Sequence, residues 1–79
     1  MTRRTDPLRY HQDHLALIEE MIASKEAAIS TQQKNIRQLL LEGRNVVPEA
    51  NAMRANAEAL RRLQSDQLAT LKLINECAG

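Results

Sequence analysis

The sequence is nearly devoid of aromatic residues, with no Trp, no Phe and one Tyr among 79 residues. It also has only two Gly and two Pro, which are residues that often form tight turns. Large aromatic side chains provide much of the burial in protein cores, so a compact globule of this size would have a weak core. The scarcity of turn residues argues against a sandwich or barrel of many short strands.

Disulfides and long apolar segments are lacking as well. Cys77 is the single cysteine, so no internal disulfide can form, which is usual in the reducing cytoplasm. Arg3 and Arg4 could open a signal peptide, but no apolar stretch follows them. Apolar runs such as residues 15–18 are much shorter than the roughly 20 residues that cross a bilayer. We expect a cytoplasmic protein that has no contact with a membrane.

An excess of charge of one sign is also absent. The sequence has 11 Lys and Arg against 10 Asp and Glu, which gives a formal net charge of +1 and a pI near 8.0. Domains dedicated to nucleic-acid binding usually have a pI above about 9. The overall charge balance therefore disfavours nucleic acid as the main partner.

What the sequence does have is a seven-residue repeat of aliphatic residues. One position of the repeat is aliphatic five times in succession, which indicates one face of a long helix: it holds Leu8, Leu15, Ile22, Ile29 and Ile36. The second position of the repeat is polar in the middle, and it holds His11, Ile18, Lys25, Gln32 and Leu39. Because Asp6 and Pro7 suit a helix start, we predict a first helix over about residues 7–42.

Residues 43–47 are predicted to form the turn that follows this helix. Gly43 suits the left-handed position after a helix end, and Asn45 tolerates turn geometry. Val46 and Val47 either fold back as an apolar plug over the helix ends or form an exposed contact patch. Pro48 suits the first position of a second helix, which we predict over about residues 48–76.

The second helix has a less regular apolar face. Its main members are Ala50, Met53, Ala57, Leu60, Leu68 and Leu71. A short turn forces the two helices to be antiparallel, and we expect Ile29 opposite Leu60 or Leu63, and Ile22 opposite Leu68. The predicted fold is all-α, a two-helix antiparallel coiled-coil hairpin that forms a single domain over residues 1–79.

One hairpin of this kind leaves apolar residues on its flanks, where a single partner helix cannot cover them. Dimerisation into a four-helix bundle would bury these residues, as in small up-down bundles. The alternative is that a different protein covers the flank. The residues expected to form the seam of the oligomer or partner contact are Leu15, Ile18, Ile22, Ile29, Ile36, Leu60, Leu68 and Leu71.

Enzymatic chemistry has little support in the sequence. His11 and His14 are three residues apart and share one side of the helix, so they could bind a metal across a dimer, although solvated histidines at the end of a bundle are the simpler interpretation. Glu19 and Glu20 are adjacent and point about 100° apart on a helix, which does not suit a general acid/base pair. We expect no catalysis, no cofactor and no metal.

The basic residues gather around the predicted turn. A patch that binds nucleic acid or an acidic protein could be formed by Arg37, Arg44, Arg54, Arg61 and Arg62. Several of the charges have a partner of opposite sign on the same helix, such as Glu58 with Arg62, which is typical of a solvated surface. A small nucleic-acid-associated protein is therefore an alternative function.

A run of residues over about 14–76 resembles short helical-hairpin proteins of bacteria, particularly of alphaproteobacteria, which have no known function. The residues that carry this resemblance are His14, Ile18, Lys25, Glu26, Ile29, Gln33, Ile36, Leu39, Leu40, Gly43, Glu49, Ala50, Leu60, Leu68 and Ile74. The layout and the Leu41-Glu42-Gly43 tip also resemble the hairpin co-chaperones of type III secretion needle subunits, which cover a hydrophobic helix of a partner.

Together these patterns predict a non-enzymatic module for protein–protein interaction, a small helical adaptor or regulator that acts as a homodimer and binds an unidentified protein partner. The second resemblance implies a co-chaperone as a further alternative.

Overall fold

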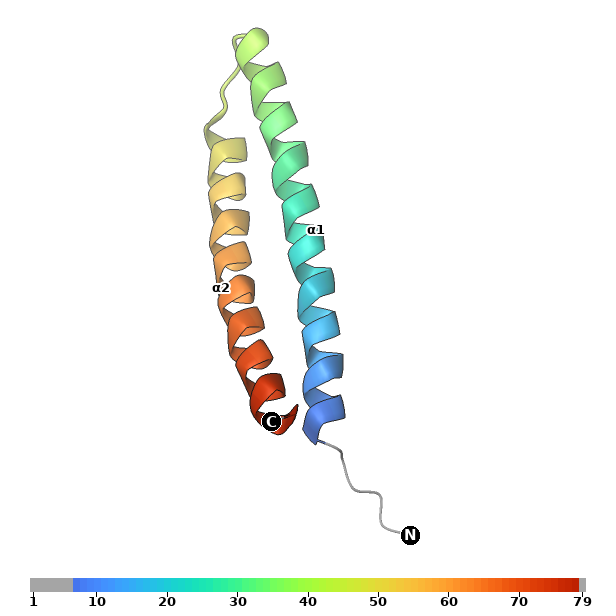
Figure 1. The fold of residues 1–79 in the computed structure, drawn as a ribbon. Coiled ribbons are helices and arrows are strands. Elements are labelled where there is room, and N and C mark those ends of the chain that lie inside the picture. The colour runs from blue at the N-terminus through green and yellow to red at the C-terminus, as the bar shows by residue number, and fades with distance from the viewer. Residues whose placement is uncertain (1–6, 79) are drawn as a thin grey trace.

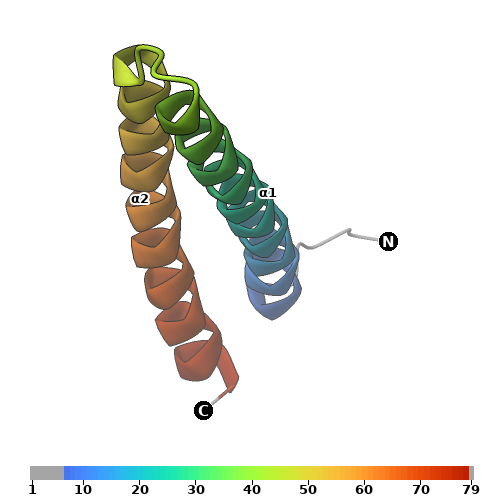
Figure 2. The same cartoon turned by 90° about the horizontal axis from the view of Figure 1, so that it is seen from above.

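The structure is a computed structural model that describes the backbone of residues 7–78 and the side chains of residues 7–77. Two helices, α1 (Pro7–Leu41) and α2 (Val47–Ala78), lie side by side and antiparallel, joined by a short turn (Figure 1, Figure 2). The predicted all-α hairpin of two helices is therefore confirmed. Helix α1 ends one residue before the predicted end, and α2 begins one residue earlier and extends further. Asp6, expected to cap α1, lies outside the described residues.

Gly43 ends α1 in the way that its position in the sequence predicts. Its backbone has a φ of 68°, the left-handed conformation that disfavours residues with a Cβ atom. The amide of Gly43 donates to the carbonyl of Leu40 at 3.1 Å, and the amide of Arg44 donates to the carbonyl of Leu39 at 2.9 Å. These two bonds form a Schellman motif, which satisfies carbonyls at the helix end that would otherwise lack a donor.

The side chain of Asn45 caps the start of α2. Its Oδ1 accepts a hydrogen bond from the amide of Val47 at 3.0 Å, and the carbonyl of Val46 accepts the first helical bond from Ala50 at 2.8 Å. Of the two valines for which the sequence left two placements open, Val46 is half-buried and Val47 is exposed. The turn therefore combines a partial apolar plug with one exposed apolar side chain.

The seven-residue repeat of α1 defines its buried face over the full length of the helix. All ten residues at the two repeat positions, from Leu8 to Leu39, are buried or half-buried, including the polar residues Lys25 and Gln32. Ile18 has the smallest exposed fraction among them, at 3%. The seam, which is the contact line between the two helices, follows the register that the sequence predicts for α1.

Helix α2 also follows a seven-residue repeat, which overlaps only in part with the predicted inward face. Its seam residues are Glu49, Met53, Asn56, Leu60, Leu63, Gln67, Thr70 and Ile74, all buried or half-buried. Leu68 and Leu71 were expected on the inward face of α2 but do not face α1, because their exposed fractions are 66% and 44%. Their place in the contact with another chain stays a prediction. Leu68 and Leu71 are the large apolar residues of this part of α2, but the helix turns their polar neighbours Gln67 and Thr70 toward α1.

The pairing of the two helices is shifted relative to the expected one. Asn56 is hydrogen-bonded to both Lys25 and Gln32, which lie one repeat apart on α1, so Asn56 is level with Ile29. The sequence-based expectation placed Leu60 or Leu63 at that level. Because Gln67 contacts Glu19, Leu63 rather than Leu68 is level with Ile22. The seam therefore alternates apolar and polar residues across the two helices, which keeps the core thin.

Replacing Gly43 with Ala is expected to lower the free energy of unfolding by about 1 kcal/mol, because the left-handed backbone would be strained. No atom outside its chain neighbours would lie within 4 Å of a Cβ atom added at Gly43, so backbone strain and not a clash is the cause. Gly43→Asn is the matched control and should lose less, since Asn tolerates this conformation. Urea unfolding, monitored by circular dichroism at one fixed protein concentration, measures the free energy of unfolding of both variants. Equal stability of the Ala and Asn variants would contradict the assignment of the loss to strain in the left-handed backbone.

Candidate functional site

The most prominent polar feature between the helices is a hydrogen-bonded chain of three side chains. The ammonium group of Lys25 donates to Oδ1 of Asn56 at 3.3 Å, and Nδ2 of Asn56 donates to Oε1 of Gln32 at 3.0 Å. All three side chains are half-buried. We call the edge of the seam on which they lie the network edge. Asn35 on α1 and Glu49 on α2 continue it toward the turn with a bond of 2.9 Å.

This polar chain fixes how the two helices are aligned. A shift of one helix by a turn would separate Asn56 from Lys25 and Gln32 and would place half-buried polar groups against aliphatic side chains. Single buried polar residues set register in coiled coils for the same reason, at a cost in stability. Ala28 and Ala59, half-buried, lie three residues after Lys25 and Asn56, and their small size lets the helices approach closely beside the network.

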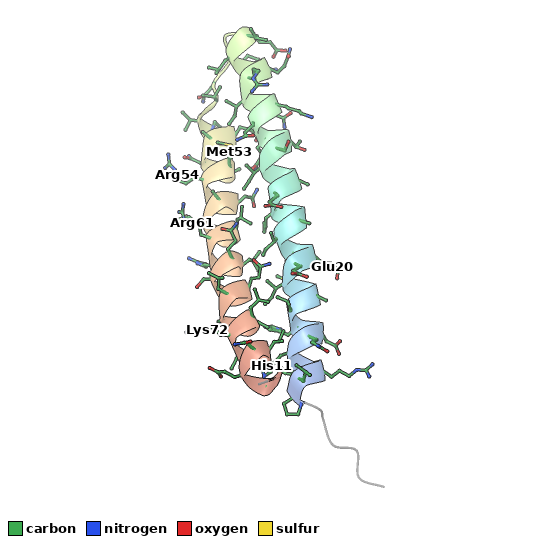
Figure 3. The ribbon with its side chains drawn as sticks, viewed as in Figure 1. His11, Glu20, Met53, Arg54, Arg61 and Lys72 are labelled. Atoms are coloured by element: carbon green, nitrogen blue, oxygen red, sulfur yellow. The ribbon has the colours of Figure 1, made fainter. Side chains whose placement is uncertain are left out.

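The opposite side of the seam, which we call the groove edge, is more aliphatic. Nε2 of Gln67 donates to a carboxylate oxygen of Glu19 at 3.5 Å there. Nearer the turn, an open groove of about 340 Å³ is lined by Gln33, Ile36, Arg37, Leu40 and Met53. Its floor contains half-buried Ile36 and Met53. Figure 3 shows Met53 pointing between the helices.

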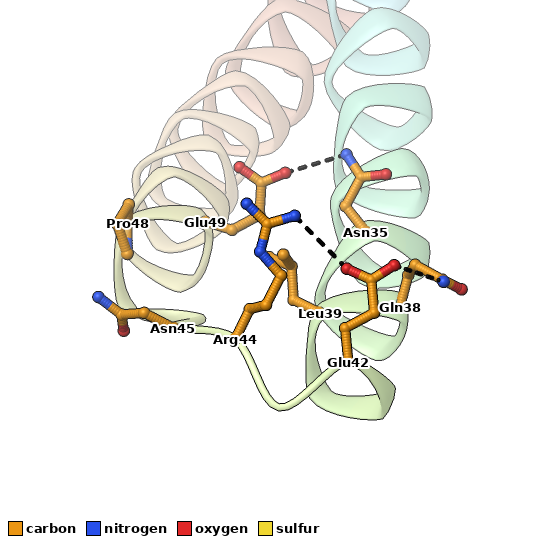
Figure 4. A pocket seen from close by; sticks show the side chains of 8 residues that line it. All are labelled: Asn35, Gln38, Leu39, Glu42, Arg44, Asn45, Pro48 and Glu49. Atoms are coloured by element: carbon orange, nitrogen blue, oxygen red, sulfur yellow. Dashed lines mark hydrogen bonds and ion pairs between the residues drawn. The ribbon is translucent and has the colours of Figure 1, made fainter.

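A second groove, of about 400 Å³, lies at the tip on the network edge (Figure 4). It is lined by Asn35, Gln38, Leu39, Glu42, Arg44, Asn45, Pro48 and Glu49. Glu42 accepts from Gln38 at 2.9 Å and pairs with Arg44 at 3.5 Å, so the polar groups of this groove largely satisfy one another. The lining holds no His, Cys, Ser or Thr, and its two carboxylates are engaged, Glu42 by Gln38 and Arg44 and Glu49 by Asn35.

The exposed large apolar side chains are the most unusual feature of the surface. They are Tyr10, Leu17, Met21, Leu40, Leu41, Val47, Leu68, Leu71 and Leu73. Among the described residues, Ile18 is the one hydrophobic residue that is buried. Single exposed apolar residues are ordinary, but nine large ones beside one buried residue leave much of the apolar surface of the described residues uncovered.

The predicted seam residues separate into two groups in the structure. Leu15, Ile18, Ile22, Ile29, Ile36 and Leu60 lie along the contact between α1 and α2. Leu68 and Leu71 point away from it and are free to contact something else. The inward polar residues Asn56, Gln67 and Thr70 were not identified from the sequence. Their signal was available, since Glu49, Asn56, Leu63 and Thr70 are spaced by seven residues.

The five arginines of the predicted basic patch do not form one cluster. Arg44 is at the turn and is the only one in an ion pair among the described residues. Arg37 lines the groove on the groove edge, and Arg54 and Arg61 point outward from α2 (Figure 3). Arg62 follows Arg61 directly, so it points about 100° away around the helix. Of the five predicted residues, Arg37, Arg54 and Arg61 lie toward the groove edge.

The histidines lie at the open end of the hairpin and contact the single tyrosine. The ring of Tyr10 is stacked on His14, with centroids 6.3 Å apart, and meets His11 edge-on at 5.5 Å. His11 is half-buried between the helices, whereas His14 is exposed. Within residues 7–77 no group of three or more His, Cys, Asp or Glu side chains could hold a metal ion. Cys77 is an exposed free thiol near the end of α2.

Comparison with protein-family models, with curated proteins and with solved structures gives no match. Neither α1 nor α2, over the residues described, combines the length and apolar character needed to cross a membrane.

Replacing Asn56 with Ala should destabilise the hairpin by about 1–2 kcal/mol, because Lys25 and Gln32 each lose a half-buried partner. Asn51→Ala is the matched control, since Asn51 lies on the exposed side of the same helix. Both variants gain the same helix propensity, so their difference reports the network alone. Thermal and urea unfolding give this difference. If the two variants prove equally stable, the hydrogen bonds of Asn56 to Lys25 and Gln32 do not stabilise the hairpin.

Proposed function

We propose that the protein is a non-enzymatic module for protein–protein interaction, a small helical adaptor or regulator that acts as a homodimer. The observation that supports this most directly is the contrast between one buried hydrophobic residue and nine exposed large ones among the described residues. Burying one Leu or Ile side chain contributes about 1.5–3 kcal/mol. A few such residues per chain are enough to decide whether a thin hairpin is stable.

The surface area of the chain supports the same proposal. A compact protein of 8.9 kDa would expose about 4,800 Å². The chain exposes 6179 Å², and its radius of gyration of 18.2 Å exceeds the roughly 12 Å of a compact domain of this length. The excess is larger than the roughly 800 Å² that each partner buries in a standard interface. A second copy can therefore cover enough surface to form a stable dimer.

The grooves support binding rather than catalysis. Both are open to solvent, and the tip groove is lined by amide, carboxylate and guanidinium groups that bond to one another. Enzyme sites usually enclose their substrate in a deeper concave pocket. The groove with Ile36 and Met53 as its floor instead suits an apolar side chain from a partner protein.

Sedimentation equilibrium tests the dimer. We expect a mass of twice the 8.9 kDa protomer at micromolar concentration, and a loss of helicity by circular dichroism when the protein is diluted. The two effects should share one midpoint, because a thin hairpin depends on the second copy for its stability. A folded monomer across the whole concentration range would contradict the proposal. A poorly folded monomer that gains helicity only with a partner protein would favour the co-chaperone alternative.

Nucleic-acid binding is the second candidate function, and the arginines on one side of the hairpin favour it. Arg37, Arg54 and Arg61 have no ion-pair partner among the described residues. If they bind phosphates, a gel shift at low salt should show a complex whose affinity falls steeply with salt. Arg54→Gln/Arg61→Gln should weaken it, whereas Arg62→Gln, which removes a charge from another side of α2, should weaken it less. Absence of any complex at low salt would remove this candidate.

A further inference from the structure

A stripe without charged residues runs along α1 next to the seam. It begins with Tyr10, His14, Leu17, Met21, Ser24 and Ala28 and continues at the same spacing to Gln38. No position of this uncharged stripe holds Asp, Glu, Lys or Arg, although 27% of the residues of the chain are charged. Because Met21 and Ala28 lie three residues after Ile18 and Lys25, the stripe borders the network edge of the seam.

Helix α2 extends this surface at the open end of the hairpin. Leu73 follows Thr70 by three residues, and Thr70 lies two repeats after Asn56, so Leu73 also borders the network edge. The bond between Gln67 and Glu19 places Leu73 level with about residues 12 and 13 of α1. The exposed side chains of Tyr10 and Leu17 are therefore within about one helical turn of the level of Leu73, whereas Met21 lies about two turns further along, about level with Asp66 of α2. The exposed fractions of these four apolar side chains are between 42 and 57%.

The groove edge has a different character. Its exposed apolar residues form two separate groups, Leu68 and Leu71 near the open end and Leu40 near the turn. On α1 the positions that border it include the charged residues Glu19, Glu26 and Arg37. Charges are depleted in the centre of protein interfaces, where Tyr and Met are enriched, and the network edge fits that composition better.

We propose that the uncharged stripe of α1, together with Leu73, is the surface on which a second copy of this chain docks. This inference rests on the proposed homodimer and adds which face forms it. Two copies that meet through this surface bring no like charges of α1 together, so desolvation costs little there. The four exposed large side chains supply the apolar centre of the contact, and the excess surface of the chain is sufficient for the area a stable dimer requires.

Paired charge substitutions on the two edges test the assignment. Leu17→Glu/Met21→Glu introduces charge in the stripe, and Leu68→Glu/Leu71→Glu introduces the same charge on the groove edge at side chains of similar exposure. The dissociation constant of the dimer, from sedimentation equilibrium, should rise by about a hundredfold or more for the first pair, since each lost contact costs about tenfold. The variant with Leu68→Glu/Leu71→Glu should remain dimeric at the protein concentration at which the wild type is dimeric.

Tyr10 provides a readout that needs no substitution. It is the only aromatic residue of the chain, so its fluorescence reports on the stripe alone. Because dilution is also expected to unfold the hairpin, the measurement is made on the folded dimer, well above its dissociation constant. Iodide should quench Tyr10 of the wild-type dimer several-fold less than free tyrosine amide, whereas a side chain that keeps the 57% exposed fraction of the single hairpin should be quenched about half as strongly as the free amide. This measurement decides the case in which both pairs of substitutions abolish dimerisation or folding.

The outcomes separate the two proposals. A wild-type dimer that is lost with the Leu68 and Leu71 pair but kept with the Leu17 and Met21 pair, or kept with both, overturns the assignment of the face and leaves the homodimer standing. Quenching of Tyr10 in the folded wild-type dimer at about half the strength seen for free tyrosine amide, as its 57% exposed fraction in one hairpin implies, also overturns it. A wild-type protein that is monomeric at every concentration overturns the homodimer itself.

Discussion

Each helix of a two-helix hairpin can bury only one stripe of its surface against the other. In this chain the buried stripe is narrow, since the inward positions of α2 include Glu49, Asn56, Gln67 and Thr70. The aliphatic residues of α1 therefore face polar residues across the seam as often as apolar ones. The single buried hydrophobic residue among the described residues and the large exposed surface both follow from this limit, and the scarcity of aromatic residues reduces the buried area further.

The polar residues in the seam give specificity at the expense of stability. A seam made only of Leu and Ile would bury more apolar area, but it would tolerate shifts by a repeat and other oligomeric states. The chain from Lys25 through Asn56 to Gln32 excludes such shifts because each displaced polar group would lose its partner. A thin seam leaves contacts outside it as a further source of stability, which connects the internal network with the homodimer that we propose.

The sequence was sufficient to predict the two helices, the turn at Gly43 and the inward face of α1, because each has a local cause. The aliphatic repeat fixes the face of α1, and the left-handed glycine fixes its end. The face of α2 and the pairing of the helices could not be found in the same way. Apolar residues alone favour Leu68 and Leu71, whereas the hydrogen bond of Gln67 to Glu19 and the 4% exposed fraction of Thr70 show that these two polar residues turn inward.

The two edges of the seam differ in what they offer a partner, and this difference bears on how a module this small could bind two proteins. The network edge is bordered by the uncharged stripe with Tyr10, Leu17 and Met21, whereas the groove edge has an apolar groove beside Arg37. A copy that docks on the stripe leaves the groove edge accessible. In the dimer that we propose, self-association and binding of a different partner would use separate surfaces, and each groove would be present twice.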